Sequence, residues 1–151
     1  MIMKKNVLTL ISLLVLMMTP TVAQATNWFD VLCDGGETVS LSPEITTSDG
    51  GASYLVWVRN SFDLPETRQA FTVERGYDKT VAYKLTLYKF TDEWNSFNII
   101  QVSIYGEDDE LIDQYANPDL ASTESVIPSG STIEVVAEAA KVIYEVKTNP
   151  E

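Results

Sequence analysis

One amphipathic segment near the C-terminus constrains the fold of this chain more than any other feature. Residues 126–144 read VIPSGSTIEVVAEAAKVIY, a turn followed by apolar residues at helical spacing. In a helix these apolar residues form a single stripe: Ile133, Val136, Ala137, Ala140, Ile143 and Tyr144. Ser131 and Glu134 have the spacing of a capping box, in which each side chain accepts the other residue's backbone N–H. The sequence therefore predicts one helix that begins after Ser131.

A helix of this length is marginal in water on its own, so the stripe needs a surface to pack against. The rest of the chain supplies strands, predicted at residues 27–33, 37–42, 53–60, 79–90, 96–106 and 110–115. Alternation is cleanest in residues 79–90, which predicts a half-buried antiparallel strand. Its two faces carry different residues: Val81, Tyr83, Leu85 and Leu87 on one, Lys84, Thr86 and Tyr88 on the other. We expect the helix to cover the apolar face and to leave the other to solvent or a partner.

The segments between these strands show no sustained period. Residues 46–51 form a turn cluster, and residues 61–78, with Pro65 and Gly76, read as a long irregular excursion. Short connections without intervening helices favour a meander. The predicted fold class is α+β, with an antiparallel β-sheet meander of about six strands and one C-terminal α-helix packed on one face.

The N-terminus has the pattern of a secretory signal peptide. Lys4 and Lys5 precede an apolar run that ends at Met18, and a small-x-small tripeptide follows at residues 23–25. The run is shorter than the roughly 20 residues of a spanning helix. We expect a signal peptide over residues 1–25, a single domain over residues 26–151, and no membrane-spanning segment. The predicted location is exported: periplasm, cell surface or extracellular.

Charge and composition exclude several functions. The chain has 10 basic and 22 acidic residues. Loss of residues 1–25 removes two lysines and leaves a net charge of about −14. Such a chain repels a phosphate backbone, so we expect no nucleic acid partner. Histidine is absent, which excludes histidine triads and the usual zinc ligand sets. The sequence predicts a protein that is not an enzyme and has no cofactor and no metal site.

Two local features have competing interpretations. Cys33 is the single cysteine, so it makes no internal disulfide, and we expect it to be buried in the first strand. The acidic residues 106–110, GEDDE, are too few for a calcium site and are typical of a solvated turn. The face with Lys84, Thr86 and Tyr88 is the better binding candidate, because aromatic and cationic groups are frequent together at protein interfaces.

The order of short motifs resembles one known family. These motifs are NWF at 27–29, YLVWVRN at 54–60, LYKFTD at 87–92, VSIYGEDDELI at 102–112 and IPSGSTIEVV at 127–136. As an ordered set they are similar to the surface-adhesin protein E family, from residue 27 to about residue 144. The resemblance implies an antiparallel sheet with a C-terminal helix against one face. It also implies binding to host extracellular-matrix glycoproteins, such as vitronectin and laminin, through a basic exposed region. The candidate protein-binding residues are Arg59, Lys84 and Tyr88.

The chain also departs from this family. The family usually links the strand that ends in the LYKF-like motif to the terminal helix by a disulfide, but here those places hold approximately Asp92 and Lys141. Two alternatives to a secreted or surface-associated adhesin stay open: a periplasmic inhibitor or immunity-like binding protein, and a carrier with a ligand cavity between helix and sheet. A homodimer through sheet edges or faces is a further arrangement that this fold allows.

Overall fold

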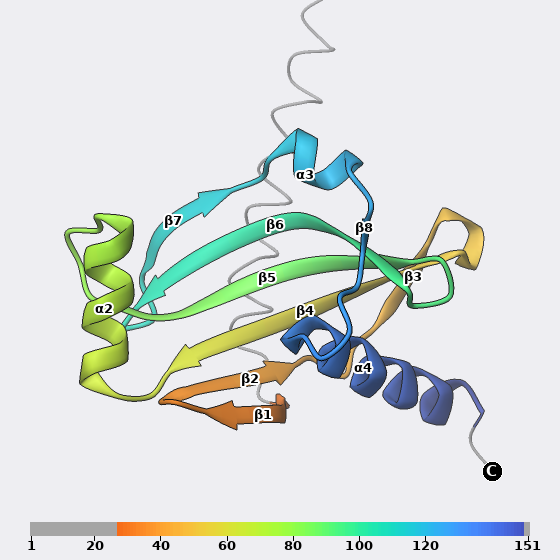
Figure 1. Ribbon diagram of the computed structural model, residues 1–151, viewed down its shortest axis with the longest axis horizontal. Coiled ribbons are helices and arrows are strands. Elements are labelled where there is room, and N and C mark those ends of the chain that lie inside the picture. The colour runs from red at the N-terminus through yellow and green to blue at the C-terminus, as the bar shows by residue number, and fades with distance from the viewer. Residues whose placement is uncertain (1–26, 150–151) are drawn as a thin grey trace, which may run out of the picture.

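The computed structural model describes residues 27–149. The predicted signal peptide, residues 1–25, lies outside the described residues. Within them, eight strands form one sheet, together with short helices and a long C-terminal helix (Figure 1). The predicted α+β class is therefore confirmed. No helix in the described part is long and apolar enough to cross a membrane.

The sheet is an antiparallel meander. Its strand order is β1 (Phe29–Asp34), β2 (Glu37–Leu41), β4 (Ser53–Phe62), β5 (Val81–Thr91), β6 (Ser96–Gly106) and β7 (Leu111–Tyr115). Two short strands extend the edges: β3 (Thr46–Ser48) pairs with the start of β4, and β8 (Ser125–Val126) pairs with the start of β6. All the predicted strands are present. The segment 46–51, predicted as a turn, contains β3 and a 3₁₀ turn, η1 (Asp49–Gly51).

The predicted terminal helix is α4 (Thr132–Thr148). Ser131 is its N-cap, and the Ser131 side chain accepts the Glu134 N–H at 3.3 Å. The reciprocal half of the predicted capping box is different. The Glu134 carboxylate accepts the N–H of Gly130 (3.2 Å), because the Ser131 N–H donates to the Pro128 carbonyl in the preceding turn. Glu134 therefore ties the helix to the turn one residue earlier than predicted.

The apolar stripe of α4 is buried as predicted. Val136, Ala137 and Ala140 are at most 4% exposed. They pack with residues of three strands and the β5–β6 turn: Val39, Leu41, Val56, Val58, Phe90 and Trp94. Ile133, Ile143 and Tyr144 pack at the margin of this cluster. Burial of such side chains is the main source of stability for a helix that is marginal alone.

The prediction for the sheet face under the helix was wrong. Tyr88 and Phe90 pack in the cluster under α4, whereas Leu85 and Leu87 point to the other side. The helix therefore covers the face on which Lys84, Thr86 and Tyr88 lie. The second half of β5 carries Leu85 and Leu87 on one face and Tyr88 and Phe90 on the other, so alternation within this strand does not identify the helix side. We call this side the helix face and the other side, with Trp57, Arg59 and Leu85, the opposite face.

A second helix lies where the sequence predicted an irregular excursion. In residues 61–78 the structure has α2 (Pro65–Arg75), with Pro65 in its first turn and Gly76 as a left-handed C-cap (φ 71°). Proline at the start and glycine after the end are common helix boundaries. Phe71 of α2 stacks on Phe62 of β4, with ring centroids 4.6 Å apart. Since Phe62 lies on the helix face, α2 and α4 cover two ends of the same face (Figure 1).

The connection after β7 also contains structure that the sequence did not predict. It forms the short helix α3 (Pro118–Ser122), capped by the Asn117 side chain, and then β8. The α3 helix lies along β6, where the Asn98 side chain donates to the Ala121 carbonyl at 3.0 Å. This segment covers the start of β6, beyond the end of β7, before the chain crosses to α4.

The β5–β6 turn holds the side chain that anchors α4. Asp92, Glu93 and Trp94 all have positive φ, between 50° and 71°, a left-handed conformation that is costly for residues other than glycine. The turn places Trp94 under the helix, 9% exposed. Its ring stacks on Tyr54, with centroids 4.2 Å apart, and leans on Phe90 at 5.4 Å. Lys141 and residues 93–95 line one groove, so the helix and this turn face each other without a covalent link.

Cys33 is exposed, which contradicts the predicted burial. A register shift between Asp30 and Leu32 changes the side-chain alternation of β1. After the shift, Leu32 pairs with Val39 on the helix face, and Cys33 pairs with Thr38 on the opposite face. Because β1 is an edge strand, the thiol on that face meets solvent.

Candidate functional site

The structure separates the predicted binding residues. Lys84 is the cross-strand partner of Asn60, and Tyr88 is the partner of Val56, so Lys84 and Tyr88 share the helix face. Arg59 is the partner of Leu85 and Ser40, on the opposite face. Since side chains alternate along a strand, Arg59 and its neighbour Asn60 point to different sides. A single basic and aromatic patch formed by all three residues is therefore absent.

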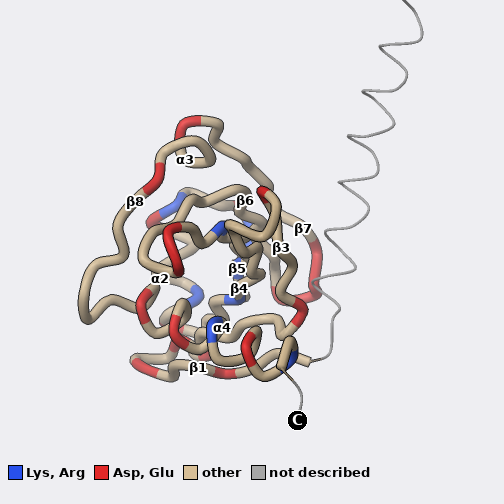
Figure 2. Tube along the Cα trace, turned by 90° about the vertical axis from the view of Figure 1, so that its right-hand side faces the viewer, with Lys and Arg blue, Asp and Glu red and all other residues tan. Residues whose placement is uncertain are grey.

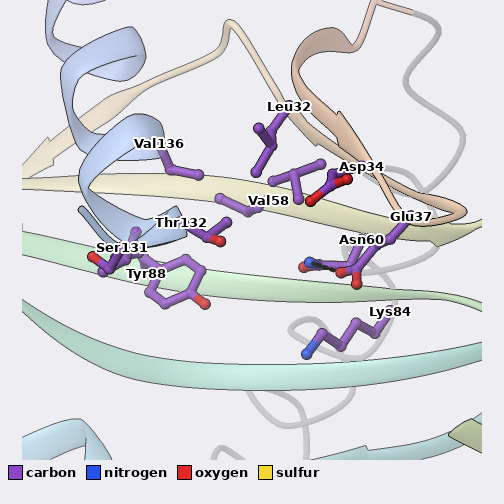
Figure 3. Close-up of a pocket in the computed structure, with 12 residues that line it drawn as sticks. Leu32, Asp34, Glu37, Val58, Asn60, Lys84, Tyr88, Ser131, Thr132 and Val136 are labelled. Carbon is purple, nitrogen blue, oxygen red and sulfur yellow. Dashed lines mark hydrogen bonds between the residues drawn. The ribbon is translucent and has the colours of Figure 1, made fainter.

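Lys84 and Tyr88 instead line a pocket of about 410 Å³. The pocket lies on the helix face, beside the start of α4 and the β1–β2 hairpin, over β4 and β5 (Figure 3). Its apolar wall consists of Leu32, Val39, Val58, Ile133 and Val136. Its polar residues are Asp34, Glu37, Asn60, Lys84, Tyr88, Ser131 and Thr132. The lining thus combines aliphatic side chains with convergent polar groups, as small-molecule sites commonly do.

Lys84 supplies the positive charge of this pocket. Its side chain is half-buried, and no ion pair in the described residues includes it. Burial lowers the pKa of the ammonium, and the nearby Glu37 charge opposes that effect. The Phe71 ring lies 6.0 Å from Nζ, at the outer limit of a cation–π contact. Lys84 therefore holds a partly desolvated charge that no carboxylate of residues 27–149 neutralises directly.

Glu37 and Asn60 form the polar wall beside Lys84. The Asn60 side chain donates to the Glu37 carboxylate at 2.6 Å, which holds both groups at the pocket (Figure 3). Across the pocket, burial raises the pKa of the Tyr88 hydroxyl. The Tyr88 ring is held between Phe90 and Phe97, with both centroids at 5.9 Å. Aromatic packing thus fixes the position of the Tyr88 ring in the pocket, and Glu37 and Lys84 supply charged groups of opposite sign.

The other polar pocket residues are not among the predicted binding residues. Asn60 interrupts an apolar alternation with Val56 and Val58, and such an interruption is a usable signal for a polar site on a buried face. Glu37 follows a turn and reads as an ordinary surface residue. Their contribution depends on the pairing of β2 with β4, which brings Val39 opposite Asn60.

The opposite face carries a different group of residues. The Arg59 guanidinium lies over the Trp28 ring, 4.8 Å from its centroid. The Nε atom of Arg59 and the indole nitrogen of Trp28 are shielded donors without a hydrogen-bond partner in residues 27–149. Nearby, Tyr83 stacks on Tyr105 with centroids 5.0 Å apart. Neither α2 nor α4 packs against this face.

The acidic turn at residues 106–110 is tied into the fold. Glu107 forms an ion pair with Arg68 of α2 at 3.0 Å, and Asp109 accepts the Tyr83 hydroxyl at 2.8 Å. The Glu110 carboxylate accepts the Asp108 N–H at 2.9 Å. Within residues 27–149 no group of carboxylate or cysteine side chains has the arrangement of a metal site. The turn joins β6 to β7 and contacts α2 and β5 through these side chains.

Together these features define a small α+β domain, in which an antiparallel sheet is covered on one face by a C-terminal helix. Two solved structures of Haemophilus influenzae protein E share this fold. Their TM-score is 0.51 at 10% sequence identity, over 79% of this chain and 86% and 90% of theirs. Protein E from non-typeable Haemophilus influenzae gives a TM-score of 0.50 at 8% identity, over 82% of this chain and 79% of that one. No family profile and no curated protein sequence matches this chain.

Proposed function

We propose that this protein is an exported binding module without catalytic activity, and that its partner is a protein. Two findings support the proposal: the fold shared with protein E and the sequence resemblance to the surface-adhesin protein E family. The finer proposal is that the partner belongs to the extracellular-matrix glycoproteins which that resemblance implies.

The observation that carries the proposal is the pair formed by Arg59 and Trp28 on the opposite face. Arginine and tryptophan are the residues most enriched where interface energy concentrates. Each of them also has a shielded nitrogen donor for which residues 27–149 supply no acceptor. An unsatisfied donor costs about 1–3 kcal/mol, so a side-chain shift that presents these donors to a carboxylate or carbonyl of a partner regains that energy.

Charge distribution defines how such binding depends on salt. Arg59, Lys84 and Lys89 lie on the central strands β4 and β5, and Figure 2 shows Asp and Glu residues spread around the outside of the fold. With 22 acidic residues in the chain, attraction to an anionic glycoprotein has to be local. Local attraction between exposed charges is screened by salt within about 8–10 Å. We expect dissociation constants that are roughly micromolar or weaker.

The test is a solid-phase binding assay of the mature chain on vitronectin and laminin, at about 0.05 and 0.15 M salt. Arg59→Glu and Trp28→Ala are expected to weaken binding. Lys79→Glu is the matched control, because Lys79 is exposed and the change in charge is the same. Circular dichroism checks that each variant is folded.

Two results would contradict the proposal. If neither vitronectin nor laminin binds at low salt, matrix adhesion is excluded. Equal losses for Arg59→Glu and Lys79→Glu would show that overall charge, and not the opposite face, governs binding. In the first case an acidic surface that occludes a basic partner becomes the better explanation, as in the inhibitor alternative.

A further inference from the structure

We propose that the pocket between α4 and the sheet is a separate small-molecule site, and that its ligand is a zwitterion with an apolar side chain, such as a free amino acid or dipeptide. This inference does not depend on the proposed protein binding, which uses the opposite face. Three properties of the pocket carry it: one cation with no ion-pair partner among residues 27–149, carboxylates in the same lining, and aliphatic side chains between α4 and the sheet.

The cation is Lys84. Its ammonium lies in the pocket, partly removed from water, and forms no ion pair with any described residue. A partly buried charge without a counter-charge costs stability, so a ligand carboxylate at Nζ is favoured twice, by charge and by hydrogen bonding. Tyr88 projects toward the same space in Figure 3, and its hydroxyl is an additional donor there.

The start of α4 favours the same end of the ligand. Ser131 and Thr132 line the pocket, and they are the N-cap and the first residue of a helix of 17 residues. The N-terminus of a helix carries a partial positive charge that attracts anions. Lys84 and the α4 N-terminus therefore both favour a carboxylate in the part of the pocket between them.

Glu37 and Asp34 supply the opposite charge. Glu37 is fixed by the 2.6 Å hydrogen bond from Asn60, and a carboxylate with one such bond still has acceptor capacity for an ammonium group. Glu37 is close enough to act on the Lys84 charge, yet the two do not form an ion pair. The gap between these opposite charges suits a ligand that carries both signs, and a simple anion would meet repulsion from the two carboxylates.

Size and lining restrict the rest of the ligand. The volume of about 410 Å³ lies at the lower end of the range of small-molecule sites. Five aliphatic side chains of the pocket offer an apolar surface for a side chain such as that of leucine. Charged groups of both signs together with aliphatic groups in one pocket match a compact amphiphilic zwitterion.

The experiment is a titration of the ¹⁵N-labelled mature chain, followed by amide chemical shifts, with L-leucine and L-leucyl-L-leucine as probes. Two analogues separate the charges: N-acetyl-L-leucine lacks the ammonium group, and L-leucinamide lacks the carboxylate. We expect shifts at Glu37, Asn60, Lys84 and Thr132, with a dissociation constant in the micromolar to millimolar range. We expect each analogue to bind about tenfold more weakly than leucine.

Variants test the assignment of each charge. Lys84→Met and Glu37→Gln are expected to weaken leucine binding about tenfold or more. Lys84→Met removes a partly buried charge and is expected to fold with at least wild-type stability, so loss of binding cannot be ascribed to unfolding. Lys79→Met is the matched control. Arg59→Glu is expected to leave leucine binding unchanged, which separates this site from the protein-binding face.

Three results would overturn the proposal. The first is the absence of pocket shifts with both zwitterions at millimolar concentration. The second is N-acetyl-L-leucine binding as tightly as leucine, which would indicate a plain anion site. The third is L-leucinamide binding as tightly as leucine, which would indicate a cation site formed by Glu37 and Asp34.

Discussion

At the residue scale, a single extra residue in β1 decides which side chains reach the pocket. The register shift between Asp30 and Leu32 directs Leu32 into the pocket and Cys33 to the opposite face. Alternation along the sequence assumes one continuous register, so it does not include this shift. A β-bulge leaves no clear signal in the amino-acid composition. The sequence therefore predicted the strand but not the exposure of its cysteine.

The exposed thiol gives the first prediction. Native protein is expected to react with a thiol reagent such as Ellman's reagent at nearly the rate of denatured protein, because Cys33 lies on an edge strand and is exposed. The measurement is the labelling rate with and without urea. A Cys33→Ser variant gives the background. Labelling that requires denaturant would contradict the position of β1 described above.

The pocket residues show how far a site can be predicted from sequence. Lys84 and Tyr88 were selected because a cation and an aromatic residue share a face of β5, and both do line the pocket. Arg59 was grouped with them on the basis of the family resemblance, although strand pairing puts it on the other side. Alternation within one strand establishes which residues are neighbours, but only pairing between strands establishes which of them meet.

At the element scale, α4 is held by an aromatic wedge. Trp94 is turned under the helix by three left-handed residues in succession. Left-handed conformations cost about 1 kcal/mol or more for residues other than glycine. That cost is offset by the burial of a tryptophan between Tyr54 and Phe90. No periodicity in the sequence distinguishes this turn from an ordinary polar hairpin turn.

The wedge gives the second prediction. Trp94→Ala is expected to lower the free energy of unfolding by about 3–5 kcal/mol, the usual cost of deleting a buried tryptophan. Urea denaturation measures this loss. Hydrogen exchange locates it: α4 amides are expected to exchange faster relative to those of β4 and β5. An equal acceleration in all elements would show that Trp94 stabilises the whole core and not the helix in particular.

The second helix shows why boundary signals and periodicity have to be read together. Residues 61–78 contain few apolar residues, so α2 has little hydrophobic pattern, and only Thr72 is buried within it. Without a sustained period, Pro65 and Gly76 indicate an irregular segment, although both are also typical of helix ends. The helix is held by specific contacts instead, such as the Arg68 side chain on the Phe62 carbonyl at 2.7 Å.

The docking of α2 leads to a prediction about pH. Burial, together with a hydrogen bond to Asp113, raises the pKa of Tyr77 to about 12. An unfolded tyrosine ionises near pH 10. This contribution to stability is therefore complete below pH 10 and is lost as the pH rises from 10 to 12. We expect the stability of Tyr77→Phe to fall less steeply over that window, measured by urea denaturation at several pH values.

Other tyrosines share this direction, which makes the comparison with wild type essential. Burial also raises the pKa of Tyr83 and Tyr105 on the opposite face. Both proteins are therefore expected to lose stability above pH 10, and only the difference between them belongs to Tyr77. Identical slopes for the two proteins would show that the hydroxyl of Tyr77 is equally exposed in the folded and unfolded chains.

At the scale of the whole molecule, the two faces of the sheet differ in what covers them. The helix face holds α2, α4 and, in the remaining space, the pocket. The opposite face carries Arg59 and Trp28. Meander topology was predictable because short polar connections separate clearly alternating segments. The difference between the two faces was not predictable, because it depends on which side of β5 the helix covers.

The absence of a second cysteine has a consequence for how this molecule matures. Its terminal helix is fastened by ring stacking around Trp94, at the place where Asp92 and Lys141 occupy the positions of a family disulfide. Stacking requires no oxidant, so docking of the helix does not depend on disulfide formation. We therefore expect the same fold in oxidising and in reducing surroundings.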